Sequence, residues 1–250
     1  MTTARPPLAG LTVLVPRARD QASDFSALLR ARGAEPLEVP TIEIRPVAST
    51  AELDRALADL AAGRFDWVVL TSVNGVAAIR ARAEALGHGP AAVTTAMVAA
   101  VGPATEAALR TWGVAPNLVP EVATTAALGQ AFPPRPGRPA GGGSGRVLLA
   151  RADLANPELG VTLRGKGWGA VEVVAYHTVP LGTLDPAARR RLDGGEVDWV
   201  AFTASSTVEG FLRGYGGPPP PGVRVAAIAA DHTIGGLVAA IEHAVAGGVG

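Results

Sequence analysis

The chain of 250 residues contains no cysteine, only one lysine and few aromatic residues. The absence of cysteine excludes disulfides, a thiolate nucleophile and thiolate metal ligands. The formal net charge is zero, so no long-range field attracts nucleic acid or an anionic membrane. No apolar run approaches the length of a membrane-spanning helix, and the first ten residues lack the apolar core of a signal peptide. We therefore expect a cytoplasmic protein that binds neither nucleic acid nor membrane.

The familiar motifs of cofactor-dependent catalysis are also missing. The four histidines do not have the H-E-x-x-H spacing of zinc enzymes. Neither a G-x-G-x-x-G nor a P-loop motif follows a predicted strand, and there is no G-x-S-x-G nucleophile elbow. The glycine-rich segment 141–145 belongs to a proline- and glycine-rich stretch, 133–145, which is typical of a flexible loop. We expect no metal and no cofactor.

An internal duplication is the most informative feature that is present. Residues 65–76 (FDWVVLTSVNGV) reappear as residues 197–208 (VDWVAFTASSTV), 132 positions later. Residues 13–39 match residues 147–173 at an offset of 134, which aligns Arg17 with Arg151 and Glu38 with Glu172. Residues 98–102 match 225–229 at an offset of 127. A single period near 130 residues indicates two domains of ordinary size, and the 48% apolar content is sufficient for two cores.

Each repeated block has the pattern of a buried strand that leads into a helix. Residues 11–15 are apolar and end at Pro16, and apolar residues with helical spacing follow as far as Gly33. Residues 67–70 and 97–101 are further short strands, each followed by a helical pattern. This alternation predicts α/β domains with parallel sheets, whose binding sites lie beyond the carboxyl ends of the strands.

Polar residues are concentrated at these predicted strand ends. Serine, threonine and asparagine are also the ordinary N-cap residues of helices, so each one alone is explained by capping. Several helix N-termini together would offer unpaired N–H groups and partial positive charge to carboxylates or phosphates. The candidates for this anion site are Arg17, Thr71, Ser72, Asn74, Thr105, Arg151, Thr203, Ser205, Ser206 and Thr207.

Six motifs in order give the chain a specific resemblance. They are V-x-V-P-R-x-R-x-Q-A, D-W-V-V-L-T-S-V-N-G-V, V-G-P-A-T-x-x-A-L, V-V-A-Y-H-T-V, D-W-V-A-F-T-A-S-S-T-V and H-T-I-x-G-L-V. Together they resemble the uroporphyrinogen-III synthase family over almost the whole chain. The resemblance implies an enzyme without a cofactor that closes the linear tetrapyrrole hydroxymethylbilane into a macrocycle, inverting the last pyrrole ring and releasing water. That substrate carries many carboxylates, which suits the predicted anion site.

The resemblance also implies a particular domain organisation. The expected fold class is α/β, with two flavodoxin-like parallel-sheet lobes joined by a two-stranded antiparallel ladder of residues 39–46 and 171–180. One lobe would combine residues 1–38 with 181–250, and the other would contain residues 47–170, including the loop 133–145. The active site would lie between the lobes. We expect the protein to act as a monomer.

Residue roles follow from the same resemblance. Tyr176 matches a family tyrosine and would donate a hydrogen bond to the leaving hydroxyl, because a phenol stays protonated at neutral pH. Its alternative role is packing between the lobes. Carboxylate binding is implied for Arg17, Thr71, Ser72, Thr105, Thr203, Ser205, Ser206 and His232. Asn74 is a further candidate from its place at a strand end, and Arg151 is one as the repeat equivalent of Arg17. Arg151 could instead pair with Glu158 or Asp153, and His232 could instead be a structural cap.

The chain departs from the family pattern in its last third. The offset between the repeats falls from 127 at residues 98 and 225 to 109 at Leu128 and Leu237, so 18 residues are missing near 229–231. The family has a G-P-x-T turn, a helix and a strand there. Their loss leaves open two alternatives: a non-catalytic two-lobe protein that binds an anionic small molecule, or an impaired or regulatory relative of the enzymes.

Overall fold

A computed structural model describes residues 5–136, 145–227 and 234–246. The chain divides into two compact units. Unit 1 contains Met1–Ile44 and Thr178–Gly250, and unit 2 contains Arg45–His177. The chain passes from one unit to the other twice, once within β3 (Ile42–Pro46) and once within β7 (Gly169–Pro180).

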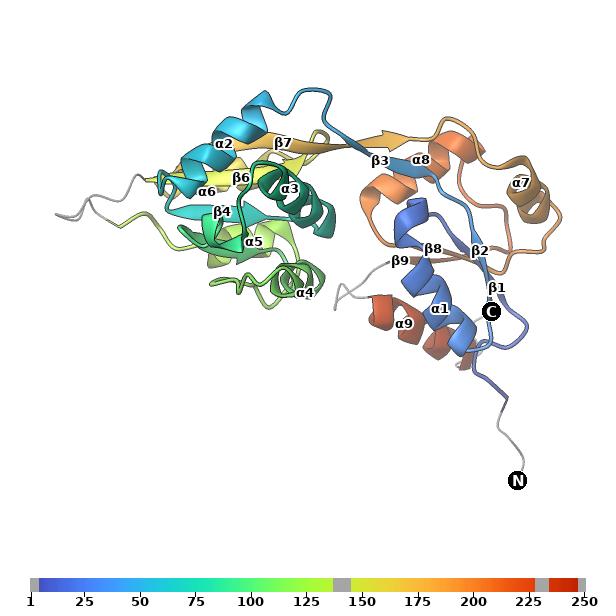
Figure 1. The fold of residues 1–250 in the computed structure, drawn as a ribbon. Coiled ribbons are helices and arrows are strands. Elements are labelled where there is room, and N and C mark those ends of the chain that lie inside the picture. The colour runs from blue at the N-terminus through green and yellow to red at the C-terminus, as the bar shows by residue number, and fades with distance from the viewer. Residues whose placement is uncertain (1–4, 137–144, 228–233, 247–250) are drawn as a thin grey trace. The chain divides into compact units, whose positions relative to one another are not determined.

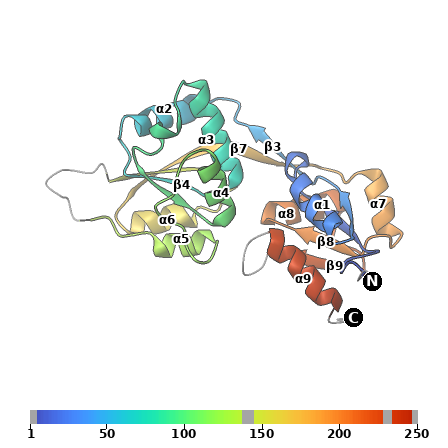
Figure 2. The same ribbon diagram turned by 60° about the horizontal axis from the view of Figure 1, so that its bottom comes forward.

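Unit 1 is built on a parallel sheet with the strand order β2-β1-β8-β9. Its strands are β1 (Thr12–Val15), β2 (Glu35–Glu38), β8 (Trp199–Phe202) and β9 (Arg224–Ala227). Helices cover both faces of this sheet, as Figures 1 and 2 show. The helices of unit 1 are η1 (Arg19–Gln21), α1 (Ser23–Ala31), α7 (Pro186–Asp193), α8 (Ser205–Tyr215) and α9 (Ile234–Ala246). Side chains of α1 and α9 pack on one face, and those of α7 and α8 pack on the other.

Unit 2 contains most of a five-stranded sheet with the order β3-β7-β6-β4-β5. Three of its strands are β4 (Trp67–Leu70), β5 (Met97–Ala100) and β6 (Arg146–Ala152), and β4 is parallel to both of its neighbours. The helices are α2 (Ala51–Ala61), α3 (Val73–Ala85), η2 (Pro90–Ala92), α4 (Pro103–Thr111), α5 (Thr125–Ala131) and α6 (Glu158–Gly165). Figures 1 and 2 show α5 and α6 on one face of the sheet and α2 and α3 on the other.

The α/β class and the two sheets of parallel strands are confirmed. Strand pairing crosses the duplication, because β1 of the first repeat pairs with β8 of the second, and β6 of the second pairs with β4 of the first. Both strands of the expected ladder exist, and β3 is the neighbour of β7 in the sheet. The antiparallel direction of this ladder stays a prediction.

The two units differ where the sequence predicted missing residues. Residues 101–124 separate β5 from α5 and include α4, and Leu118 forms a parallel bridge to Ala99. Only residues 228–233, which lie outside the described parts, separate β9 from α9. Val98 of β5 is 1% exposed, whereas Val225, its equivalent in β9, is 52% exposed.

Candidate active site

The strongest site candidate is the hydroxyl of Tyr176, which lies at the carboxyl edge of the sheet in unit 2. The residue is buried, and its Oη lies 2.9 Å from the Oγ of Ser72. Ser72 is the N-cap of α3, and its Oγ accepts a hydrogen bond from the N–H of Gly75 at 2.9 Å. The phenol is thereby coupled to the first turn of a helix, where backbone N–H groups lack intrahelical partners.

The position of Tyr176 depends on an irregularity in β7. Arg151 pairs with Val174 and Ala152 pairs with Tyr176, so Ala175 is an extra residue in β7. The burial pattern shows the consequence: Val173 and Ala175 are buried on either side of the exposed Val174, but Tyr176 is buried as well. A β-bulge re-aims the side chains that follow it. Here it brings Tyr176 to the side of the strand where its hydroxyl meets Ser72.

The surroundings of Tyr176 keep its phenol protonated. Burial raises its pKa above the ordinary value, hydrogen bonds with Ser72 and Asn74 act in the opposite direction, and the negative charge of Asp153 raises it further. Desolvation is the largest of these effects because it disfavours the phenolate. The hydroxyl is therefore available as a hydrogen-bond and proton donor at neutral pH.

An acid–imidazole pair lies next to this tyrosine and was not predicted from the sequence. Asp153 Oδ2 is 2.7 Å from Nδ1 of His177, and the Asp153 N–H donates to the carbonyl oxygen of Tyr176 at 3.3 Å. The only sequence signal is that His177 directly follows Tyr176. The sequence did not identify Asp153 as the partner of His177, because the bulge changes the register between β6 and β7.

The other predicted residues of unit 2 occupy two neighbouring helix N-termini. Thr71 and Asn74 are half-buried and flank Ser72 at the start of α3. Thr105 lies in the first turn of α4 and is only 3% exposed. Since β4 pairs in parallel with β5, both helices begin at the same edge of the sheet.

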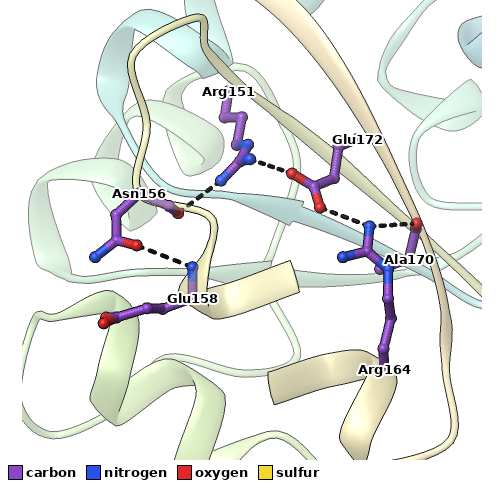
Figure 3. Close-up of polar contacts among 6 residues, drawn as sticks. All are labelled: Arg151, Asn156, Glu158, Arg164, Ala170 and Glu172. Carbon is purple, nitrogen blue, oxygen red and sulfur yellow. Dashed lines mark hydrogen bonds and ion pairs between the residues drawn. The ribbon is translucent and has the colours of Figure 1, made fainter. Parts of the chain in front are cut away.

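Arg151 has two structural partners that the sequence did not predict. Its guanidinium forms an ion pair with Glu172, and its Nη1 donates to the carbonyl oxygen of Asn156 at 2.7 Å. Glu172 also binds Arg164, with 2.6 Å between the atoms, so its carboxylate lies between two guanidinium groups (Figure 3). The alternative partners suggested by the sequence were Glu158 and Asp153, but the carboxylate that pairs with Arg151 is that of Glu172, and Asp153 pairs with His177.

The equivalent turn in unit 1 has a different construction. Ala204 takes the place of Ser72 before α8, so no N-cap hydroxyl is present, and Thr207 instead donates to the carbonyl oxygen of Ala204 at 2.6 Å. Ser205 is exposed, whereas Thr203 and Ser206 are half-buried, as is Arg17 after β1. His232 lies outside the described residues. The carboxylate-binding role of this group stays a prediction.

Across the described parts of the chain, no cluster of histidine, aspartate and glutamate has a geometry suited to a metal ion. None of the helices described there combines the length and apolar character needed to span a bilayer.

Comparison with known proteins identifies the family. The sequence model described as Uroporphyrinogen-III synthase HemD matches residues 23–235. This chain belongs to the uroporphyrinogen-III synthase family. The match includes Tyr176 and the predicted turns, but Arg17 precedes it.

Individual relatives agree with this assignment. The uroporphyrinogen-III synthase of Synechococcus elongatus is 34% identical over 211 residues, covering 84% of this chain and 76% of that protein. The porphyrin biosynthesis protein HemD of Ruminiclostridium josui is 27% identical and matches 82% of this chain and 40% of its own length. A crystal structure of a mutant uroporphyrinogen III synthase from Thermus thermophilus has a TM-score of 0.65 at 22% identity, covering 95% of this chain and 99% of that one. This structural likeness supports the fold.

Proposed function

We propose that this protein is a lyase of heme biosynthesis that cyclises hydroxymethylbilane to uroporphyrinogen III, with inversion of the last pyrrole ring and loss of water. Its membership of the family supports the reaction class. The observation that carries the chemistry is the buried Tyr176 hydroxyl, fixed against Ser72 at the start of α3. The proposal places the protein in the cytoplasm as a monomer that needs no cofactor.

In the proposed reaction, Tyr176 assists departure of the terminal hydroxyl group. The C–O bond of the hydroxymethyl group breaks, and the oxygen leaves as water after accepting a proton, for which the phenol is the donor. The freed methylene carbon then bonds to the substituted α-carbon of the last pyrrole ring, and the bond from that carbon to the neighbouring bridge carbon breaks. The bridge carbon bonds to the ring's other α-carbon, which loses its proton, so the macrocycle closes with the last ring inverted. Since the electron-rich pyrrole already favours loss of water, most of the catalytic effect comes from holding the chain ends in the inverted geometry.

The carboxylates of the substrate would bind at helix N-termini. In unit 2 we assign this role to the first turns of α3 and α4, with the side chains of Thr71 and Asn74. Thr105 is buried, so we expect its turn to act through backbone N–H groups. In unit 1 the proposed groups are Arg17, Thr203, Ser205 and Ser206. We assign Arg151 a supporting role, because Glu172 and the Asn156 carbonyl occupy its guanidinium.

A turnover experiment separates this proposal from a protein that only binds an anionic small molecule. Freshly prepared hydroxymethylbilane is supplied in about 100-fold excess over protein, and the loss of the linear tetrapyrrole is followed against a protein-free sample. A catalyst consumes many equivalents faster than the spontaneous reaction. If one equivalent of hydroxymethylbilane were protected from the spontaneous reaction and the rest reacted no faster than without protein, a protein that only binds would be favoured.

A further inference from the structure

Exposed apolar side chains gather at one edge of the sheet in unit 2. Val73 is the first residue of α3, directly beyond β4, and is 44% exposed. Leu154 lies in the loop that follows β6 and is 66% exposed. Leu70 of β4 pairs with Ala150 of β6, so the carboxyl ends of the two strands lie side by side.

A third exposed apolar residue belongs to the same edge. Val122 is 50% exposed, and the next residue, Ala123, packs so closely on Gly102 that a Cβ atom there would lie 2.4 Å from the Ala123 Cβ. Gly102 directly precedes α4, just beyond the end of β5. Val122 therefore lies by the carboxyl end of β5, the strand on the other side of β4.

Leu154 is held at the surface by a loop that is fixed at both ends. At one end, Asp153 bonds to His177 and to the backbone of Tyr176. At the other end, Arg151 Nη1 holds the carbonyl oxygen of Asn156 at 2.7 Å, as Figure 3 shows. The Leu154 side chain is thus presented next to the strand segment that carries the candidate catalytic residue.

An isolated apolar side chain on a surface is ordinary and needs no explanation. Three of them beyond neighbouring strands, interspersed with the N-termini of α3 and α4, suit a ligand that combines apolar rings with carboxylates. We propose that Val73, Val122 and Leu154 form a contact surface for the pyrrole rings of the linear tetrapyrrole substrate. This inference rests on the proposed function and adds the residues that bind the apolar part of the substrate.

The test replaces each of the three residues with serine and measures KM and kcat with hydroxymethylbilane. We expect KM to rise about 3- to 10-fold for each variant, because part of an apolar side chain no longer leaves water on binding. The kcat should stay within about 2-fold, as expected for an interaction made equally in the ground and transition states. Melting temperatures should change by less than about 2 °C, since the side chains are exposed. Leu154→Met should retain the wild-type KM.

Two matched controls are available in the same unit. Met97 is 44% exposed at the amino end of β5, the opposite edge of the sheet, and Val161 is 62% exposed on α6. Met97→Ser and Val161→Ser should leave KM unchanged. An equal rise in KM for these controls, or an unchanged KM for all three edge variants, would overturn the inference.

A binding measurement keeps this inference separate from the proposed reaction. Uroporphyrin III, the stable oxidised form of the proposed product, is titrated into each variant while tryptophan fluorescence is recorded. The three edge variants should bind it about 3- to 10-fold more weakly than the wild type and the two controls. If the wild type has no turnover but this ranking holds, the proposed reaction is wrong and the contact surface is retained. Identical affinities across all variants would contradict the contact surface.

Discussion

The Tyr176 hydroxyl combines a buried position with hydrogen bonds to the side chains of Ser72 and Asn74. Ser72 reaches it from the N-terminus of α3, and Asp153 lies beside the backbone of the same tyrosine. Burial has the largest effect on its pKa, and it favours the neutral phenol. Among single residues, Tyr176 is therefore the proposed proton donor.

Tyr176→Phe removes this hydroxyl with almost no change in volume. We expect kcat to fall by about 10- to 100-fold, because general-acid assistance to the leaving group is lost. Tyr215→Phe is the matched control. The Tyr215 hydroxyl also has a hydrogen-bond partner, because it donates to the Asp193 carboxylate at 2.7 Å, but Tyr215 belongs to α8 of unit 1. Steady-state kinetics with both variants decide the role. Equal rates for Tyr176→Phe and the wild type would leave Tyr176 as a packing residue.

The raised pKa of Tyr176 also predicts a pH dependence of stability. The folded protein holds the phenolic proton more tightly than the unfolded chain, in which tyrosine titrates near pH 10. This contribution to stability is complete below about pH 10 and is lost as the pH rises through the folded-state pKa. Urea unfolding at several alkaline pH values should show a steeper loss for the wild type than for Tyr176→Phe. If the free energy of unfolding fell equally with pH in the wild type and in Tyr176→Phe, the Tyr176 phenol would have the same pKa in the folded and unfolded states.

At the scale of elements, the bulge in β7 explains what the sequence could not predict about the site. The strand pattern and the resemblance led to Tyr176, and the T-S turn led to Ser72. The contact of Asp153 with His177 depends on the extra residue Ala175, which changes the register without a signature in the hydrophobic pattern. Arg151 was placed correctly at a strand end, but its partner Glu172 lies on β7, whose pairing with β6 was not predicted.

The duplication supplies a matched pair of ion-pair variants. Glu172 binds two arginines, and its side chain is 21% exposed, while that of Arg151 is 15% exposed. Its repeat equivalent Glu38 contacts Arg30 at 3.5 Å, with side-chain exposures of 36% and 58%. Glu172→Gln should lower the free energy of unfolding by about 1–3 kcal/mol, since it leaves the largely covered guanidinium of Arg151 and the half-exposed one of Arg164 without a carboxylate.

Glu38→Gln should cost less than about 0.5 kcal/mol, because exposed ion pairs contribute little. Chemical denaturation of both variants gives the comparison. A cost for Glu38→Gln as large as that for Glu172→Gln would mean that burial does not determine the strength of these pairs.

At the scale of the whole molecule, the sequence predicted the fold class from strand and helix patterns in the two repeats. The pairing of β1 with β8 across the repeats could not be derived from periodicity, which is local, and followed only from the family resemblance. The shorter second repeat was visible as a change in offset. In the structure Val225 is exposed, whereas its equivalent Val98 is covered in a unit that contains α4.

This difference predicts unequal local stability in the two units. Amide hydrogens of β9 should exchange faster than those of β5, because β9 is less covered and β5 is additionally bridged by Leu118. Hydrogen exchange followed by mass spectrometry resolves the two segments. Equal protection of β5 and β9 would show that the missing residues are compensated elsewhere.

The most direct test of the central claim is the isomer composition of the product. Hydroxymethylbilane is mixed with the protein, the porphyrinogens are oxidised at early times, and the isomers are separated. We predict mainly uroporphyrinogen III, formed faster than the spontaneous isomer I, with Tyr176→Phe giving the same isomer more slowly. Isomer I alone, at the rate of the protein-free reaction, would contradict the proposed function.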